Sequence, residues 1–98
     1  MNSSLFVLGL NGDSRCTFLT GDGIGGPEVY VGSKRGSACV DACLKRKTTD
    51  SSINGVSVYT NTSKGGCSCE KSMNGRNSNT GVKSCFIGVT GRTLFKWI

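Results

Sequence analysis

The sequence predicts a small α+β domain in which one helix packs on an antiparallel sheet of short strands and disulfides hold the layers together. The chain has 98 residues, which suits one domain with one core over residues 1–98. Its six cysteines are an even number in a short, Gly-rich chain, a pattern typical of a disulfide framework and an oxidising compartment. Short β-like runs around a single helical pattern complete the prediction.

Runs rich in β-branched and aromatic residues predict the strands. They cover residues 4–10, 16–19, 28–31, 56–60, 67–70, 85–89 and 93–98. The run 56–60 alternates apolar and polar side chains, as expected for a strand with one buried face. Because every run is short, we expect a sheet of short strands.

Turn signals separate these runs. Three Asn-Gly pairs favour tight turns, because both residues tolerate positive φ: Asn11-Gly12, Asn54-Gly55 and Asn74-Gly75. Residues 21–27 are too rich in glycine for a strand and predict an exposed loop. This loop lacks the Gly-Lys-Ser/Thr ending of a phosphate-binding loop, so we expect no nucleotide site there.

One segment has the pattern of an amphipathic helix. Residues 38–47 contain no Gly or Pro, and Ser37 is the predicted N-cap. Basic residues in the last turn complement the helix dipole, and residues 48–52 are expected to end the helix. The apolar positions recur at the helical period and form one stripe, made of Cys39, Val40, Cys43 and Leu44.

The cysteine spacings predict two neighbouring disulfides between the helix and a strand. Cys39 and Cys43 lie about one helical turn apart, roughly 6 Å along the axis. Cys67 and Cys69 share one face of a strand, roughly 6.7 Å apart. A helix laid on that strand would form two adjacent bridges, and the spacing allows either pairing.

Two cysteines are left over, and they predict a third disulfide that joins the two ends of the domain. Cys16 and Cys85 each fall in an outer predicted strand, and closing so long a loop contributes about 4 kcal/mol in the chain-entropy model. A single zinc site made of the four inner cysteines is the alternative, but zinc knuckles usually use Cys-x₂-Cys. A catalytic thiol would need a base, and the chain has no His. We therefore expect no metal and no cofactor.

Three motifs in residues 36–71, about a third of the chain, resemble the PAN/apple family. They are a helix with Cys39-x₃-Cys43, a central strand over residues 55–60, and a strand with Cys67-x-Cys69 followed by charged residues. In that family an outer cysteine pair joins the termini, which matches the remaining two cysteines. The resemblance implies one helix on a short antiparallel sheet, and a binding or adhesion function that is directed at proteins in some members and at carbohydrates in others.

The resemblance also implies a nested set of disulfides. The implied pairs are Cys16–Cys85, Cys39–Cys69 and Cys43–Cys67. The sequence departs from the family in one respect, since many members place the fourth cysteine before the central strand, whereas Cys67 follows it. The swapped inner pairing, Cys39–Cys67 with Cys43–Cys69, therefore stays open.

The composition excludes several classes of enzyme. Without His, the chain cannot build Ser-His-Asp or Cys-His catalysis, a His-ligated metal site or a histidine pH switch. The six acidic residues are scattered, and no local pair resembles a glycosidase dyad, so we expect no enzymatic activity. The longest apolar run, residues 5–10, is too short to span a bilayer. It also lacks the flanks of a signal peptide, so secretion would require a targeting segment removed before Met1.

The net charge of +6 predicts an anionic partner such as a sulfated or acidic glycan. Five basic residues flank the predicted helix, which is about 15 Å long, and could bridge such a polyanion: Lys34, Arg35, Lys45, Arg46 and Lys47. The alternative explanation is that the last three complement the helix C-terminus and keep the domain in solution. Nucleic acid is not expected, because the basic residues do not alternate with aromatic residues and disulfides belong outside the cell.

Aromatic residues beside polar loops are candidates for a neutral-sugar site, because the C–H faces of sugars stack on aromatic rings. The candidate rings are Tyr30, Tyr59 and Trp97. Tyr59 precedes a polar loop that contains Asn61, and a second polar loop carries Arg76. We expect Tyr59, Asn61 and Arg76 to frame a pocket, although a Tyr at the end of a strand also commonly packs at the rim of a core.

These observations predict a secreted, non-enzymatic binding module whose leading function is carbohydrate recognition of the lectin type. Direct protein–protein adhesion is the alternative, and a disulfide-rich toxin or antimicrobial protein is a minor one, since a single helix offers only a small cationic surface. Asn2 and Asn61 begin glycosylation sequons, so either can carry a glycan instead of binding one. Weak single sites gain strength by multivalency, so the sequence allows a homodimer.

Overall fold

The computed structural model describes residues 14–60 and 65–87, and the structural statements below concern this part of the chain. Several sequence predictions lie outside the described residues: the strands over residues 4–10 and 93–98, the Asn11-Gly12 turn, the sequons at Asn2 and Asn61, and Trp97. For the described residues the predicted α+β class is confirmed. Among them, no helix combines the length and hydropathy that a bilayer crossing requires.

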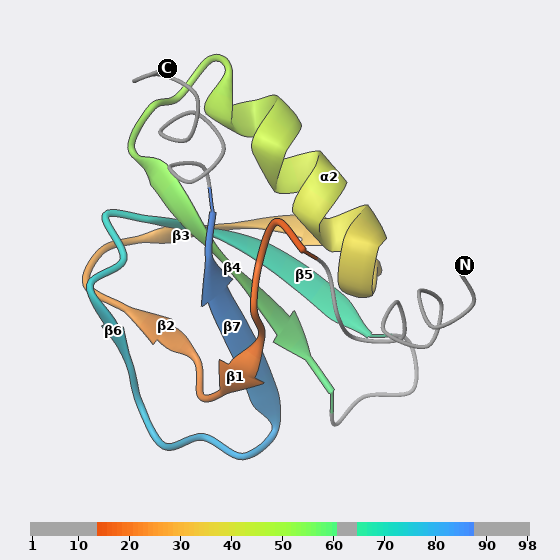
Figure 1. Cartoon of the computed structure of the whole chain (residues 1–98), viewed down its shortest axis with the longest axis vertical. Helices are drawn as coiled ribbons and strands as arrows, with labels where there is room; N and C mark the ends of the chain where they lie inside the picture. Colours follow the sequence, from red (N-terminus) through yellow and green to blue (C-terminus); the bar gives the residue numbers. More distant parts are fainter. Residues whose placement is uncertain (1–13, 61–64, 88–98) are drawn as a thin grey trace.

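One helix and seven strands make up the described part of the chain (Figure 1). In order they are β1 (Leu19–Thr20), β2 (Gly23–Ile24), β3 (Glu28–Gly32), α2 (Gly36–Lys47), β4 (Ile53–Tyr59), β5 (Gly66–Lys71), β6 (Gly75–Arg76) and β7 (Val82–Phe86). Five strands form an antiparallel sheet in the order β1-β7-β4-β5-β3, and β2 and β6 form a separate two-stranded ribbon. The predicted strands are short, as expected, although β4 and β7 each begin three residues earlier than the sequence indicates.

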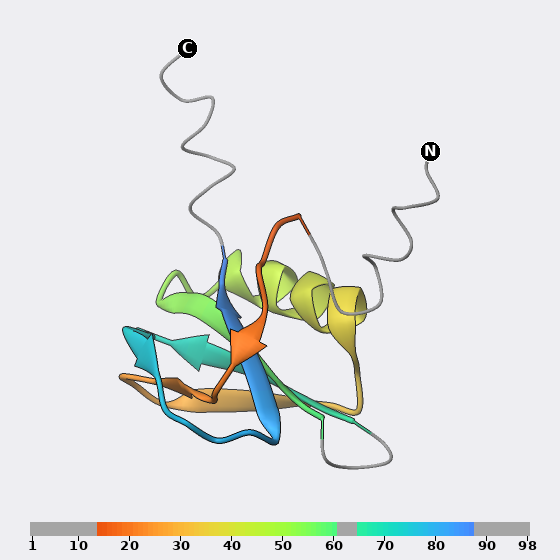
Figure 2. The ribbon, with the colours of Figure 1, turned by 60° about the horizontal axis from the view of Figure 1, so that its bottom comes forward.

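The helix covers one face of the sheet, as Figure 2 shows. Successive residues of a strand point to opposite faces, so every second residue of β4 and β5 faces α2. The resulting core is dominated by small apolar side chains and sulfur, and its buried members include Val40, Val56, Val58, Ile53, Ile87 and all six cysteines. The predicted apolar stripe of the helix is confirmed, since Cys39, Val40 and Cys43 are buried and Leu44 packs against them.

The helix starts differently from the sequence prediction. It begins at Gly36, with Arg35 rather than Ser37 at the N-cap, and no side chain caps it. The backbone carbonyl of Arg35 accepts hydrogen bonds from the N–H groups of Ala38 and Cys39 instead. Gly36 has a φ of 46°, a conformation that glycine adopts without strain. The turn into the helix therefore depends on this glycine and not on a serine cap.

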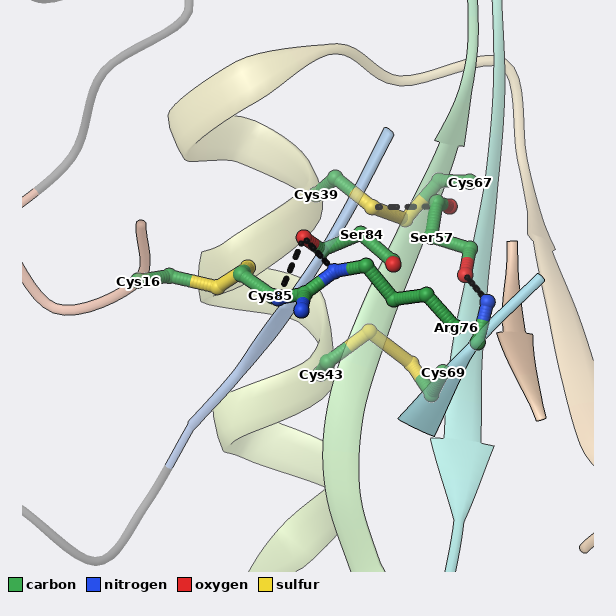
Figure 3. The surroundings of a disulfide bond; sticks show 10 residues. Cys16, Cys39, Cys43, Ser57, Cys67, Cys69, Arg76, Ser84 and Cys85 are labelled. Carbon is green, nitrogen blue, oxygen red and sulfur yellow. Dashed lines mark hydrogen bonds between the residues drawn. A yellow bond between two sulfur atoms is a disulfide. The ribbon is translucent and has the colours of Figure 1, made fainter. Parts of the chain in front are cut away.

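Three disulfides join the elements, with Cα–Cα distances of 5.4, 5.6 and 5.4 Å: Cys16–Cys85, Cys39–Cys67 and Cys43–Cys69 (Figure 3). The outer pair agrees with the sequence prediction. The nested inner pairing implied by the family resemblance, Cys39–Cys69 with Cys43–Cys67, is wrong. In the fold α2 and β5 run in the same direction past each other, so the first cysteine of the helix meets the first cysteine of the strand.

The glycine-rich segment 21–27, predicted as an exposed loop, contains β2 and lies partly buried. Gly23 pairs with Arg76 and Ile24 with Gly75, which builds the ribbon. Gly21 and Gly23 are buried, and a Cβ atom at Gly23 would lie 2.9 Å from Glu70 Cδ. Glycine is thus needed here because the ribbon lies directly on the sheet, a reason that the sequence does not display.

The turn predicted at Asn54-Gly55 is also wrong, because both residues lie within β4. The pairing of β4 with β5 shifts register between Ile53 and Gly55, which is the behaviour of a β-bulge. The Asn54 amide donates to the Met73 carbonyl at 2.9 Å and accepts from the Met73 N–H at 2.7 Å. Asn54 therefore anchors the segment that follows β5 instead of reversing the chain.

Candidate functional site

The face of the sheet opposite α2 is polar although it is buried. Its buried members are Ser57, Ser68, Glu70 and Ser84, each no more than 1% exposed. The ribbon contacts this face through a hydrogen bond from the Gly23 N–H to Ser57 Oγ, 3.1 Å long. Two oxygens, Asp22 Oδ1 and Ser84 Oγ, are buried without a hydrogen-bond partner among the described residues. Burying polar side chains costs free energy unless they are hydrogen-bonded, so a buried sheet face made of polar residues is unusual if its role is only structural.

Three carboxyl groups gather beneath the ribbon. One oxygen each from Asp22, Glu28 and Glu70 lies within 4.8 Å of the others. Glu70 is 1% exposed, and its Oε2 accepts a hydrogen bond from the Ser57 hydroxyl at 2.6 Å. Burial, together with the neighbouring carboxyls of Glu28 and Asp22, raises the pKa of Glu70 to about 8, although the Ser57 hydroxyl opposes the shift. At neutral pH this cluster therefore holds a proton on Glu70.

Tyr59, a predicted sugar-stacking residue, belongs to the edge of this polar face. Its hydroxyl donates to Glu28 Oε2 at 2.9 Å and lies 3.3 Å from Ser68 Oγ. Burial raises the pKa of Tyr59 to about 12, so the phenol keeps its proton. The ring also lies against Gly66, where an added Cβ would come within 2.6 Å of it. Tyr59 is thus half-buried at the edge of the sheet, with its hydroxyl engaged by Glu28.

A groove along the β1 edge of the sheet is a better candidate for binding. It has a volume of about 290 Å³ and is lined by Ser14, Arg15, Cys16, Thr17, Leu19, Arg76 and Phe86. Two of these, Leu19 at 51% and Phe86 at 44% exposed, are large apolar side chains that remain open to solvent. None of the described residues that line it is acidic. The groove therefore combines an apolar floor with two guanidinium groups.

Arg76 is the one predicted site residue that lines this groove. Its Nε and Nη2 both donate to the Ser84 carbonyl at 3.2 Å, and its guanidinium carbon lies 5.6 Å from the centre of the Phe86 ring. Figure 3 shows the side chain extending from β6 to the Ser84 carbonyl on β7. These contacts fix the guanidinium group and use only two of its five N–H donors. The group is therefore positioned in advance, with donors left for a ligand.

Arg15 provides the second guanidinium group of the groove. Its Nη1 lies 2.6 Å from Asp41 Oδ1 on α2, so an ion pair with the helix holds the segment that precedes β1. Cys16, the next residue, is bonded to Cys85 on β7. The disulfide and the ion pair together place this segment against the edge of the sheet, where it forms one wall of the groove.

The predicted basic residues flank α2, as the sequence indicates, but Lys47 differs from the others in its contacts. Lys47 is half-buried, and its Nζ donates to the Ile53 carbonyl at 2.6 Å and to the Ser51 carbonyl at 3.3 Å. It therefore fastens the chain after the helix and is not available as a free charge. Lys45 and Arg46 are exposed and line a shallow depression with Thr48 and Thr49.

The two basic residues before the helix lie at its other end. Lys34 is partly buried, and Arg35 is exposed at the N-cap, where it contacts Gly65. Neither Lys34 nor Arg35 lines the groove that contains Arg76. The five predicted residues thus fall into two groups at opposite ends of α2.

The cysteines offer no metal site. Sulfur atoms of Cys39, Cys43 and Cys67 lie within 4.8 Å of one another, but each takes part in a disulfide and has no thiolate to bind zinc. The other close group of potential ligand atoms in the described residues is the carboxyl cluster, in which Glu70 Oε2 accepts the hydrogen bond from Ser57.

Five lining residues of the groove were not found by sequence reasoning: Ser14, Arg15, Thr17, Leu19 and Phe86. The two apolar ones are Leu19 and Phe86. Both lie inside predicted strands, where an apolar residue is normally assigned to the core. A signal was present for Phe86, which directly follows Cys85: if the cysteine faces the core, the next residue faces the other side. Glu70 carries the same signal, since it directly follows Cys69.

A scan against protein-family models and searches of curated proteins and of solved structures find no match for this chain.

Proposed function

We propose that this chain is an extracellular, non-enzymatic binding module of the PAN/apple type that recognises an acidic carbohydrate in the groove formed by Arg15, Leu19, Arg76 and Phe86. The observation that carries the proposal is the fixed guanidinium group of Arg76 beside the exposed ring of Phe86. Sugar rings present C–H faces that pack on an aromatic ring, and a carboxylate or sulfate group pairs with a guanidinium. One short groove meets both requirements.

The charge of the groove favours acidic over neutral sugars. Its described lining contains two arginines and no carboxylate. Arg15 is paired with Asp41 on α2, whereas Arg76 has donors that its protein contacts leave unused. The rest of the lining is small and polar, with Ser14 and Thr17 able to bind sugar hydroxyls. A volume of about 290 Å³ suits one or two sugar rings.

The extracellular location and the lack of catalytic activity are parts of the same proposal. Three disulfides support an oxidising compartment, because cytosolic thiols are kept reduced. The acid with the most altered pKa, Glu70, is covered by the ribbon and has no path to a substrate. A shallow groove with fixed donors is suited to retention of a ligand.

A glycan array with a salt titration tests this function. We expect binding to glycans that carry uronic acid or sulfate groups, and a part of this binding should persist at high salt because stacking is not screened. Phe86→Ala should weaken binding by about tenfold or more, as expected when an aromatic contact is lost from a small site. Tyr30→Ala is the matched control, since Tyr30 is 61% exposed on β3, at the other edge of the sheet.

The outcomes separate the candidates. If Phe86→Ala and Tyr30→Ala bind alike, the groove is not the site. If no glycan binds, carbohydrate recognition fails, and a protein partner becomes the better explanation. Adhesion to a protein is the second candidate because Tyr30 presents an exposed aromatic ring on an edge strand.

A further inference from the structure

The ribbon of β2 and β6 is held on the sheet by a short chain of hydrogen bonds that ends at Glu70. The Gly23 N–H donates to Ser57 Oγ at 3.1 Å, and the Ser57 hydroxyl donates to Glu70 Oε2 at 2.6 Å. Gly23 also lies close to the carboxyl group, since a Cβ added there would lie 2.9 Å from Glu70 Cδ. A change in the ionisation of the Glu70 carboxyl therefore affects the ribbon first.

The charged groups that face Glu70 are all acidic. Glu28 faces it from β3 and Asp22 from the residue before β2, each within 4.8 Å, and Tyr59 on β4 is a neutral phenol. The basic residue of the ribbon, Arg76 on β6, directs its guanidinium group to the Ser84 carbonyl. A negative charge on Glu70 would thus be buried between two carboxylates.

We propose that a proton on Glu70 keeps the ribbon closed over the sheet. Removal of this proton at alkaline pH releases the ribbon and disorders Arg76, the ribbon residue that lines the groove. The first half concerns the fold alone. The second half rests on the proposed function, because it links the proton to ligand binding in that groove.

The ribbon is the part of this face that can move. The sheet beside it is crosslinked, because β5 and β7 each carry cysteines that are bonded to other segments. The ribbon has two residues in each strand and contains no cysteine. Its further bonds join residues 22–24 to residues 74–77, from the Asn74 N–H to the Ile24 carbonyl and from the Asn77 N–H to the Asp22 carbonyl. It can therefore lift as one unit while the sheet stays intact.

The ribbon is also directly connected to the groove. Gly23, which rests on Glu70, is the pairing partner of Arg76. If Gly23 leaves the sheet, the backbone of Arg76 moves with it, and the two hydrogen bonds to the Ser84 carbonyl break. The groove would then lose the guanidinium group that the proposed ligand requires.

Hydrogen exchange followed by NMR tests the release of the ribbon. The reporter is the N–H group of Gly23, which donates to Ser57 on the sheet, with the amides of β4 and β5 as internal references. The N–H groups of Asn74 and Asn77 bond within the ribbon, so they should stay protected if the ribbon lifts as one unit. After correction for intrinsic exchange, we expect reporter protection to fall by about tenfold or more between about pH 6 and about pH 9, while the sheet changes little. In Glu70→Gln, which keeps the acceptor for Ser57 but cannot ionise, reporter protection should stay constant.

Asp50→Asn is the matched charge control. Asp50 lies outside the cluster and pairs with Lys71 at 2.9 Å, so its removal should leave the alkaline release of the ribbon unchanged. Reporter protection in the wild-type protein that is equal at both pH values overturns the proposal. Should Glu70→Gln not fold, the ¹³C titration of the Glu70 carboxyl in the wild-type protein decides, since a midpoint different from that of ribbon release also overturns it.

A second measurement separates this inference from the proposed function. Binding of a heparin oligosaccharide to the wild-type protein should weaken together with the ribbon protection, and binding to Glu70→Gln should persist at alkaline pH. Binding that survives release of the ribbon would overturn the link to the groove. An absence of heparin binding at every pH would contradict the proposed function, while the exchange data would still decide whether Glu70 controls the ribbon.

Discussion

Glu70 is the residue whose environment departs most from that of an ordinary surface acid. It follows Cys69, and because the cysteine faces the helix, the carboxyl must point to the opposite face of the sheet. There it meets the Ser57 hydroxyl, two other carboxyl groups and the ribbon. Because neighbouring residues of β5 face opposite sides of the sheet, this strand supplies both a disulfide in the core and a buried acid on the other face.

The first prediction concerns the pH dependence of stability that Glu70 causes. The folded chain keeps the proton up to about pH 8, whereas the unfolded chain releases it near the ordinary value of 4.5. Between these values the folded state binds more protons, so the free energy of unfolding should fall as the pH rises, by at most about 1.4 kcal/mol per pH unit. The contribution is complete below pH 4.5 and lost above about pH 8.

Urea denaturation at a series of pH values measures this slope. Glu70→Gln should remove it, because the amide cannot titrate. A wild-type slope equal to that of Glu70→Gln over this range would show that the folded protein does not hold the proton.

Among the elements, the β2–β6 ribbon is the one that the sequence did not predict. Glycine-rich segments are normally exposed, and residues 21–27 carry no alternating pattern of apolar residues. The glycines are needed because backbone approaches the sheet face, with Gly23 against both Glu70 and Met73. A single sequence shows that a glycine is present but does not show what it touches.

The second prediction follows from this close approach. Gly23→Ala would place a Cβ 2.9 Å from Glu70 Cδ and Met73 Sδ, so it should destabilise the protein by about 1–3 kcal/mol through overpacking. Gly75→Ala, in the facing strand, is the matched control, since the nearest atom to its Cβ would be Ile24 Cδ1 at 3.8 Å. Thermal or urea unfolding of both variants gives the comparison, and equal losses would contradict the close contact at Gly23.

The third prediction concerns the outer disulfide. Cys16–Cys85 spans 69 residues, against 28 for Cys39–Cys67, so in the chain-entropy model it restricts the unfolded chain most. Replacing both outer cysteines by Ser should lower the free energy of unfolding by about 4 kcal/mol. Because Cys16 adjoins Arg15, the same change should also weaken ligand binding in the groove. A variant that binds normally would show that the disulfide does not position this wall.

The sequence was sufficient for the features that depend on local periodicity, and insufficient for those that depend on how elements meet. The helix stripe follows from spacing alone, as do the two bridges between Cys39 or Cys43 and Cys67 or Cys69. The choice between the two pairings requires the direction of α2 relative to β5, which no local pattern contains. The groove joins the segment before β1 to β6 and β7, so its residues are far apart in the sequence. Local patterns also do not show that neighbouring residues engage the Tyr59 hydroxyl and the Lys47 ammonium group.

At the scale of the whole molecule, the question is whether net charge or one site attracts a polyanion. The chain carries +6, so some retention on heparin is expected of any part of its surface. The helix-end residues Lys45 and Arg46 are the strongest competitor to the groove, since both are exposed. They can be removed without disturbing Lys47, whose bonds to the Ser51 and Ile53 carbonyls support the fold.

The last prediction uses two double variants with the same change in charge. Lys45→Ala with Arg46→Ala, and Lys34→Ala with Lys83→Ala, each lower the net charge from +6 to +4. If the groove is the site, both pairs should lower the salt concentration that elutes the protein from heparin by similar small amounts, because they alter only the long-range field. Phe86→Ala should lower that salt concentration by more than either pair, although it leaves the net charge unchanged, because it removes the binding that persists at high salt. A large loss confined to the Lys45 and Arg46 pair would instead place the polyanion site at the end of α2.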